Sequence, residues 1–452
     1  MKTEAFNNEI VVSAYTSDEE REIISLLSYT DKSKEFQARK MENNRFIPRH
    51  LVEKVKQEAH GNLISYKEDR SIVVPPGFID QFKIDTDNRV DTGSTISLPW
   101  NVEPPKARPY QEEAVELMLN NKRGVINMGT GLGKTLTSVH FLRKFKRKAL
   151  IVCPSSSIAN GFYEELCKAF GKNRIGYMGG GKKKVGDITV GLAQTIVKNT
   201  DMLKDLGVII TDECHHLPAI TFYEIANKLS YVGRMFGLSA TAFRSDGKDI
   251  FIEAALGKVL IKLDAAWGIE NGWLAFPHFI VRKVNTQGPN YPGDKLKNYK
   301  KHVLESKEMT DVICKDINWA VEKQQSVLVL VSEIEHGEIL SKATGLPLAT
   351  GENKESKNLI DSLNDGKIPG LIATSSLVGE GCDTRRVDVL VLANFAGSAG
   401  PVTQNVGRGL RKYPGKEEVI IFDYMPNNQM LARHCNTRIK VFKTLSQEIR
   451  IV

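Results

Sequence analysis

The chain has 452 residues, enough for two to four domains, and its 41% hydrophobic and 26% charged residues are typical of a soluble globular protein. No apolar run approaches the ~18 residues of a membrane span, no secretory signal opens the chain, and the six scattered cysteines include no CxxC pair. These features exclude a membrane span and argue against a zinc module or a disulfide scaffold. We therefore expect a cytoplasmic protein, and its net charge of +8 mildly favours polyanionic partners.

The first part of the chain, residues 1–95, mixes short β-branched runs with charged, helix-like stretches, which predicts a small α+β domain. Between Lys32 and Gln57, eight Lys and Arg residues against three Glu give this stretch a charge of +5, with two phenylalanines among them. Such a patch predicts contacts with DNA phosphates, and a solvated charged face is the alternative. The candidate contact residues are Arg39, Lys40 and Arg49.

Two similar zones follow a Thr-, Ser- and Pro-rich stretch at 91–109, which we interpret as a linker. From Tyr110 to about Leu263, and again from Phe279 onward, short strand-like runs alternate with amphipathic segments. That alternation is typical of a parallel sheet flanked by helices. The sequence therefore predicts an α/β protein with two tandem parallel-sheet domains, at 96–268 and 269–452, after the N-terminal domain.

The stretch GVINMGTGLGKTLTSVHFL, residues 124–142, has the pattern of a strand, a glycine-rich turn and a helix. Backbone N–H groups in such a turn point at phosphate oxygens. Lys134 can reach the β- and γ-phosphates, and the Thr135 hydroxyl can coordinate Mg²⁺. The general phosphate-loop pattern has glycine where this chain has Met128. We predict an NTP site formed by Met128, Gly129, Thr130, Gly131, Leu132, Gly133, Lys134 and Thr135.

An acidic pair follows an apolar run within LGVIITDECHHL. The run, Val208–Thr211, reads as a buried strand that delivers Asp212 and Glu213 to its carboxyl end, where ligands of open α/β sheets bind. We expect Asp212 to hold Mg²⁺ and Glu213 to orient or deprotonate an attacking water. His215 either couples this site to its neighbours or is an ordinary exposed histidine.

Four stretches in fixed order, MGTGLGKT, DECH, LSAT and QNVGRGLR, resemble the motifs of superfamily-two helicases and translocases. The resemblance covers roughly residues 105–430 and implies two RecA-like domains with ATP bound between them. It assigns catalytic roles to Gln404, Arg408 and Arg411, with Arg411 the stronger candidate for an arginine finger. Because Arg408 and Arg411 stand three residues apart, we expect them to share one face of a helix.

Other roles are carried over from the same family position by position. Arg108 and Gln111 match the adenine motif, Ser239 and Thr241 match the element that couples hydrolysis to domain movement, and Gly379 and Asp383 match a motif near the ribose. Glu380 stands where many relatives have arginine, so that role is not transferred. Contacts with the nucleic-acid backbone are expected at Pro154, Ser155, Gln194, Thr195, Thr374 and Ser375, although each is also compatible with a plain strand-end turn.

The stretch WGIENGWLA at Trp267–Ala275 resembles the joint of the double-stranded-DNA translocase branch. Together with a small N-terminal domain before a compact motor, it suggests similarity to phage branch-migration helicases of the UvsW type. The resemblance implies an ATP- and Mg²⁺-dependent DNA helicase that acts as a monomer on forks and four-way junctions in replication, recombination or repair, in the host cytoplasm if phage-encoded. An RNA helicase or RNA-stimulated ATPase, or the motor subunit of a larger complex, is the alternative.

Overall fold

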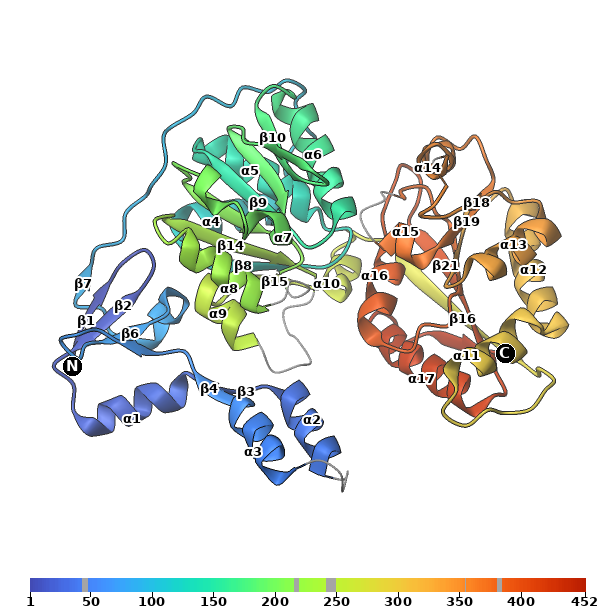
Figure 1. Cartoon of the computed structure of the whole chain (residues 1–452). Helices are drawn as coiled ribbons and strands as arrows, with labels where there is room; N and C mark the ends of the chain where they lie inside the picture. The colour runs from blue at the N-terminus through green and yellow to red at the C-terminus, as the bar shows by residue number, and fades with distance from the viewer. Residues whose placement is uncertain (43–47, 215–218, 241–248, 354, 380–383) are drawn as a thin grey trace. The chain divides into compact units, whose positions relative to one another are not determined.

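The computed structural model describes the whole chain except residues 43–47, 215–218, 241–248, 354 and 380–383 (Figure 1). It divides into two compact units, Met1–Met128 with Gly133–Lys262, and Gly129–Leu132 with Leu263–Val452. The expected division into three domains stays a prediction. Among the helices that the structure describes, none is both long and apolar enough to span a membrane.

The N-terminal part of unit 1 is a five-stranded sheet with helices beside it. Its strands, in the order β5-β6-β2-β1-β7, are β5 (Ser65–Tyr66), β6 (Ile72–Val74), β2 (Ile10–Ser13), β1 (Lys2–Ala5) and β7 (Thr86–Asp87). Helix α1 (Ser17–Leu26) begins at a capping box, in which Glu19 N–H donates to Thr16 Oγ1 and Thr16 N–H donates to the Glu19 carboxylate. The apolar face of the sheet packs on the rest of unit 1, since Ala254 lies in the same buried cluster as Ile10 and Val74.

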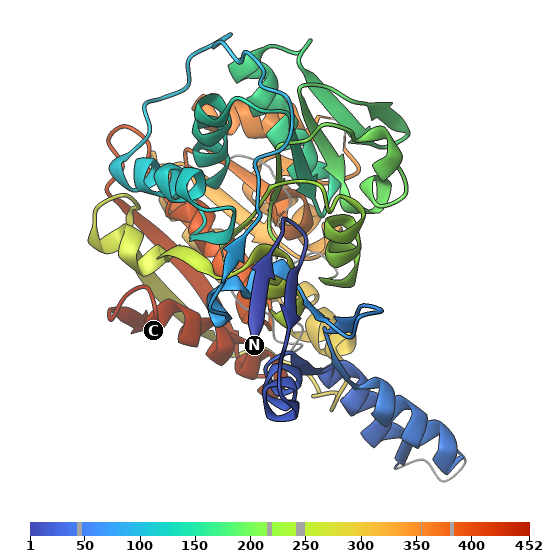
Figure 2. The same ribbon diagram turned by 90° about the vertical axis from the view of Figure 1, so that its left-hand side faces the viewer.

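A helical hairpin is inserted into this part of the chain. Helices α2 (Lys32–Glu42) and α3 (Arg49–Glu58) pack side by side (Figures 1 and 2). The two-stranded ribbon of β3 (Ser28–Thr30) and β4 (His60–Asn62) closes the base, where Thr30 pairs with His60. The hairpin therefore leaves and rejoins the chain at adjacent points.

The stretch that we expected to be a linker is fastened along unit 1. Arg234, which is 9% exposed, donates from Nε to Asp91 Oδ1 at 2.8 Å. The Thr92 hydroxyl donates to Leu206 O at 2.9 Å, and Trp100 stacks on Phe170 with ring centroids 5.3 Å apart. The stretch is therefore bound to the fold at these points, while its interpretation as a linker between domains stays a prediction. Its Thr, Ser and Asp side chains bind neighbouring groups of the fold.

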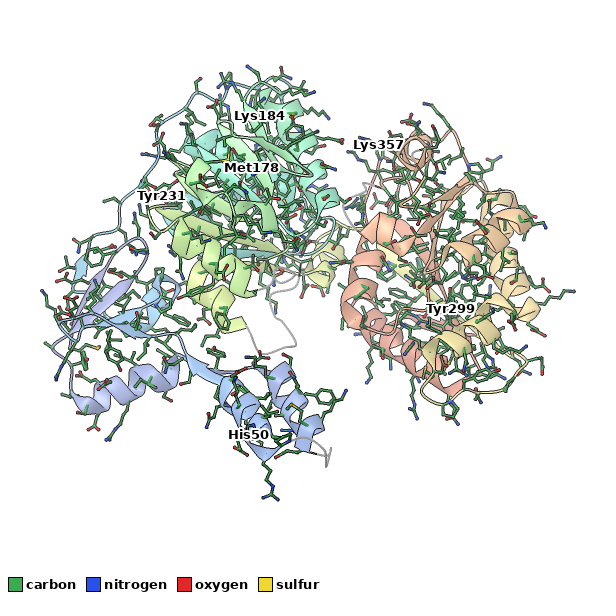
Figure 3. The ribbon with its side chains drawn as sticks, in the orientation of Figure 1. His50, Met178, Lys184, Tyr231, Tyr299 and Lys357 are labelled. Atoms are coloured by element: carbon green, nitrogen blue, oxygen red, sulfur yellow. The ribbon has the colours of Figure 1, made fainter. Side chains whose placement is uncertain are left out.

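The larger sheet of unit 1 has eight strands in the order β11-β10-β12-β9-β13-β14-β8-β15. These strands are β8 (Arg123–Met128), β9 (Ala149–Cys153), β10 (Ile175–Gly179), β11 (Lys182–Lys184), β12 (Ile188–Leu192), β13 (Val208–Thr211), β14 (Arg234–Ser239) and β15 (Val259–Leu263). Its helices are α4 (Pro109–Asn120), α5 (Lys134–Phe145), α6 (Ser156–Phe170), α7 (Ala193–Ile196), α8 (Ala219–Lys228) and α9 (Asp249–Leu256). The strands from β10 through β8 pair in parallel apart from the edge strand β11, so their carboxyl ends share one edge. Met178 lies inside this sheet and Lys184 at its exposed edge (Figure 3).

Unit 2 contains a seven-stranded sheet in the order β18-β19-β17-β20-β21-β16-β22. Its strands are β16 (Phe276–Val284), β17 (Val327–Val331), β18 (Leu348–Ala349), β19 (Gly370–Thr374), β20 (Val389–Ala393), β21 (Glu418–Pro426) and β22 (Ile449–Ile451). Its helices are α10 (Ala265–Glu270), α11 (Lys295–Tyr299), α12 (Lys307–Glu322), α13 (Ile334–Thr344), α14 (Ser356–Asn364), α15 (Ser375–Gly379), α16 (Ala399–Gly409) and α17 (Gln429–Lys443). Neighbouring strands again pair in parallel, which confirms the expected α/β class with tandem parallel sheets.

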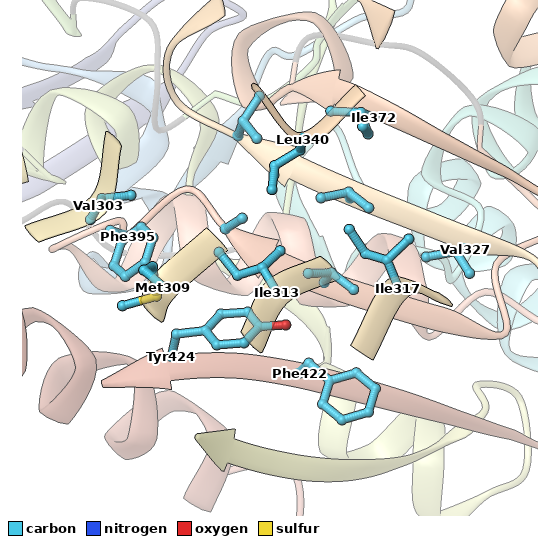
Figure 4. Close-up of a cluster of buried hydrophobic side chains, with 14 of the residues drawn as sticks. Val303, Met309, Ile313, Ile317, Val327, Leu340, Ile372, Phe395, Phe422 and Tyr424 are labelled. Atoms are coloured by element: carbon cyan, nitrogen blue, oxygen red, sulfur yellow. The ribbon is translucent and has the colours of Figure 1, made fainter. Parts of the chain in front are cut away.

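The core of unit 2 forms where α12 covers the sheet. Met309, Ile313 and Ile317 lie one helical turn apart and face strand residues such as Val327 and Phe422 (Figure 4). The spacing of these apolar residues explains why the segment forms an amphipathic helix. The central strands are apolar on both faces because helices cover both sides of a parallel sheet.

A buried ion pair fastens α17 to β21 in this unit. Arg438 is fully buried, and its Nε donates to both carboxylate oxygens of Asp423 at 2.9 Å. Its terminal nitrogens donate to the carbonyls of Ala396 and Tyr424. Every part of the guanidinium therefore has a partner, which offsets the cost of burying the charge.

We predict that Arg438→Met destabilises unit 2 by about 3–5 kcal/mol, because it leaves the Asp423 charge buried without its partner. Arg433→Met is the matched control, since Arg433 is exposed on the same helix and should change stability by less than about 0.5 kcal/mol. Denaturant unfolding followed by circular dichroism measures the difference. Equal midpoints for the two variants would contradict the structural role of the pair.

Candidate nucleotide-binding and catalytic site

The glycine-rich turn joins β8 to α5. Gly131 and Gly133 have φ of 92° and 85°, which only glycine adopts without strain, and Gly133 caps the first turn of α5. The backbone N–H groups of that turn are therefore available to an anion. Met128 is the last residue of β8 and fully buried, with its sulfur 3.9 Å from the Thr137 hydroxyl beneath α5. Because position 128 belongs to the strand, the turn does not need glycine there.

The acidic pair follows β13 directly. The Asp212 N–H donates to Val152 O at 3.0 Å, which continues the sheet pairing by one residue. Glu213 has a φ of 43°, an uncommon conformation for a residue with a side chain. In this conformation, Glu213 Oε1 lies 3.3 Å from Lys134 Nζ, which also donates to Met128 O at 3.2 Å. The structure thus brings together the predicted lysine and the predicted acidic pair, although Lys134 and Asp212 are 78 residues apart in the sequence.

Asp212 has an unusual electrostatic environment. Burial raises its pKa to about 7, the nearby charge of Glu213 acts in the same direction, and Lys134 opposes both. Its Oδ1 is buried and has no hydrogen-bond partner among the residues that the structure describes. A buried carboxylate oxygen without a donor is suited to a cation. The described residues contain no cluster of three His, Cys, Asp or Glu, so such a cation would need other ligands as well.

Two further contacts converge on this edge of the sheet. Gln111 is buried, its Oε1 accepts from Arg108 N–H at 2.9 Å, and its Nε2 donates to Gly133 O at 3.5 Å. With its amide nitrogen turned toward β14, Asn127 donates to Ser239 O at 3.2 Å. The sequence did not reveal Asn127, because the pairing of β8 with β14 that places it beside Ser239 is not encoded in any local pattern.

The arginine-containing segment lies in unit 2. Gln404 and Arg408 are on α16, but α16 ends at Gly409, and Arg411 follows the C-cap residue. The prediction that both arginines share a helical face is therefore wrong for Arg411, whose N–H donates to Arg408 O at 3.3 Å after the helix has ended. A β-carbon placed on Gly131 would lie 3.3 Å from Arg411 Cγ, so the tip of the glycine turn adjoins this segment within unit 2.

The nucleic-acid contacts expected within the two tandem domains stand at the carboxyl ends of parallel strands. Pro154 and Ser155 follow β9, where Ser155 caps α6, Gln194 and Thr195 lie on α7 after β12, and Thr374 and Ser375 join β19 to α15. Gln194 is exposed, whereas Thr374 is buried. Ser375 accepts from Asn394 Nδ2 at 2.8 Å. Their contact with a ligand stays a prediction.

The remaining predicted residues lie on the helical hairpin, at the end of α15 and outside the described residues. Arg39 and Lys40 lie exposed on α2, and Arg49 begins α3. Gly379 ends α15. His215, Thr241 and Asp383 lie outside the residues that the structure describes.

The raised pKa of Asp212 predicts a pH dependence of stability. Between about pH 4 and 7 the folded state holds a proton that the unfolded state lacks, so rising pH lowers the free energy of unfolding through this window. Asp212→Asn should remove this slope and become more stable than the wild type at pH 8. Thermal melts at pH 5 and pH 8 without metal measure it, with the exposed Asp201→Asn as control. If the melting temperatures of Asp212→Asn and the wild type differ by the same amount at both pH values, the pKa of Asp212 is not raised.

Comparisons with known proteins agree with the predicted nucleotide site and the two parallel sheets. Residues 105–244 match the family model of the type III restriction enzyme res subunit. The ATP-dependent DNA helicase uvsW of Enterobacteria phage T4 is 24% identical over 363 residues, covering 73% of this chain and 70% of the relative. The putative DNA 3'-5' helicase Rad25 of Halobacterium salinarum is 24% identical over 355 residues, covering 75% of this chain but 57% of that protein.

Solved structures show the same fold. A fragment of a putative HsdR subunit of a type I restriction enzyme from Vibrio vulnificus has a TM-score of 0.57 at 21% identity, covering 78% of this chain and 70% of that one. S. cerevisiae Dbp5 bound to RNA and ADP BeF3 has a TM-score of 0.55 at 15% identity. The match covers 76% of this chain and 88% of that one. These matches indicate an ATP-dependent helicase, and the ordered motifs and tandem RecA-like sheets resemble those of superfamily two.

Proposed function

We propose that the chain hydrolyses ATP with Mg²⁺ at the edge of the unit 1 sheet. Lys134 and the N–H groups of the glycine turn would bind the phosphates, and Thr135 with Asp212 would hold the metal. The donor-free Oδ1 of Asp212 supports the metal site. Mg²⁺ bound there would neutralise phosphate charge.

In the same proposal, Glu213 orients the attacking water and accepts its proton. The ion pair with Lys134 would keep the Glu213 carboxylate beside the phosphates that Lys134 binds. Gln111, beside Gly133, would recognise the adenine, and Arg411 would stabilise charge on the transferred phosphoryl group, with Arg408 and Gln404 beside it on α16.

We further propose that ATP hydrolysis drives remodelling of branched DNA, such as forks and four-way junctions. The observation that supports this most is the match to a phage DNA helicase, uvsW, across 73% of this chain and 70% of that one. Several relatives carry the description 3'-5', including the translocase XPB2 of Sulfurisphaera tokodaii, which supports tracking with this polarity. Branch migration replaces each broken base pair by a new one, whereas unwinding costs about 1.4 kcal/mol per step.

The helical hairpin α2–α3 provides the surface that we propose for DNA. Four of its lysines form two classes. Lys34 and Lys56 are paired with Glu58 and Glu42 at 3.0 and 2.5 Å. Lys32 and Lys54 are exposed and make no ion pair with a described residue, which leaves their charge for phosphates.

An exposed aromatic ring adds to this surface. Phe36 is 60% exposed on α2, and Lys40 Nζ lies 4.8 Å from the centre of its ring. An aromatic ring beside unpaired cations suits a strand whose bases are unstacked at a branch point. His50 lies on the neighbouring helix α3 of the same hairpin (Figure 3).

The test compares ATP hydrolysis with matched single strand, duplex, fork, four-way junction and structured RNA, and scores the strand products. We expect the greatest stimulation with branched DNA, together with conversion of junctions into duplex arms. Stimulation by RNA alone would favour the alternative of an RNA helicase, since Dbp5, which was solved bound to RNA, has the same fold. No activity without added protein would favour a motor subunit, for which the HsdR fold is a precedent.

A second experiment tests the hairpin. Because Thr30 and His60 are paired neighbours, residues 31–59 can be replaced by an Asn-Gly turn that leaves the sheet and its contacts with α9 in place. This variant should keep its basal ATPase and lose its preference for junctions. The double variant Lys32→Gln and Lys54→Gln should weaken DNA binding and its salt dependence more than Lys34→Gln and Lys56→Gln. Equal effects of the two pairs, or an unchanged junction preference after excision, would count against the hairpin.

A further inference from the structure

The edge strand β11 of the larger unit 1 sheet consists of lysine alone. Its three side chains, Lys182, Lys183 and Lys184, are exposed, and none of them forms an ion pair with a residue that the structure describes. The surrounding residues 167–186 contain six Lys and Arg and no Asp or Glu. This stretch thus carries a charge of +6, against +8 for the whole chain. An unpaired basic edge of this kind suits a polyanion.

The lysines stand on a fixed strand. The turn between β10 and β11 consists of Gly180 and Gly181, whose φ values of 54° and 81° are those that a two-residue type I′ turn requires at both positions. A β-carbon on either glycine would meet no atom within 4 Å, so a partner can approach the turn closely. After β11, Gly186 N–H donates to the hydroxyl of the buried Thr189 at 3.1 Å. Anchoring at both ends lowers the entropy that the lysines lose when they contact a ligand.

The turn lies at the same sheet edge as two of the proposed nucleic-acid contacts. Strands β10 and β12 pair in parallel and lie about 4.8 Å apart, so the turn after β10 adjoins the start of α7 after β12. Helix α7 carries Gln194 and Thr195 and packs on both strands. Lys183 pairs with Met178, whose side chain lies in one buried cluster with Ile196 of α7. Because paired residues point to the same face, Lys183 is on the side of the sheet that α7 covers.

We propose that Lys182 and Lys183 bind the phosphate backbone of DNA and extend the contact surface of α7 by one strand at the edge of the sheet. Lys182 pairs with Gly179, the last residue of β10, and so stands directly at the turn. This inference rests on the proposed function, because it takes the DNA contacts at Gln194 and Thr195 as its reference. Phosphate contacts of this kind position a duplex without reading its sequence. Lysines also protect sheet edges from pairing with other chains, and the test separates the two roles.

The test measures binding of a fluorescent DNA duplex to Lys182→Gln with Lys183→Gln over a range of salt concentrations. Each lost phosphate contact lowers the slope of log K against log salt by about 0.9, so this pair should lose about 1.8. Lys168→Gln with Lys172→Gln is the matched control. It removes the same charge from two exposed lysines that come before β10 begins, at the other end of that strand, and should keep the wild-type slope. Lys182→Arg with Lys183→Arg retains the charges and should also keep that slope.

The outcomes distinguish this inference from the function on which it rests. Equal losses of slope in the two glutamine pairs would overturn the inference, since they would show a general effect of net charge. An unchanged slope with aggregation of Lys182→Gln with Lys183→Gln would also overturn it and leave these lysines as protectors of the sheet edge. The proposed function fails in a different way, because DNA would then not stimulate ATP hydrolysis by the wild type. If DNA stimulates the wild type and the two glutamine pairs bind alike, the inference alone fails.

Discussion

The parallel register of β13, β14 and β8 is the constraint on which the site depends. Thr211 pairs with Gly237 and Ser239 with Asn127, so the three strands end at one edge of the sheet. At that edge, the segments that follow β8 and β13 carry the candidate catalytic side chains. The turn after β8 presents Lys134, the turn after β13 presents Glu213, and the two side chains meet at 3.3 Å. A shift of one residue in this register would turn the strand side chains to the other face of the sheet and displace the turns that carry Lys134 and Glu213.

Burial of the acidic pair is the second feature that favours a ligand-binding site at this edge of the sheet. Asp212 is 7% exposed, and its pKa is raised because removing a charged carboxylate from water costs free energy. The left-handed backbone at Glu213 adds strain at the same position. Such costs are typical of residues whose placement serves a ligand, and the ion pair with Lys134 offsets part of them. Arg438 and Asp423 show the contrasting case in unit 2, where a buried charge is fully satisfied by its own fold.

The sequence revealed the parts of this site that are local. The glycines of the turn, Lys134 and the acidic pair stand next to apolar strand runs, and the strands themselves follow from that pattern. Contacts between distant segments could not be seen. Asn127 reaches Ser239 only because β8 pairs with β14, and the supposed linker is held by Arg234 from a strand 143 residues away. The helix end before Arg411 was also missed, although Gly409 closes α16 and Pro414 and Gly415 follow soon after it.

The central claim is that the carboxyl edge of the unit 1 sheet hydrolyses ATP through Glu213. Its most direct test measures ATP binding and phosphate release on the same preparation of Glu213→Gln. The amide keeps the size of the side chain but cannot accept the proton from water, so binding should be retained while phosphate release falls by about 100-fold or more. Retained binding with near-normal phosphate release would contradict the account and place the catalytic base elsewhere.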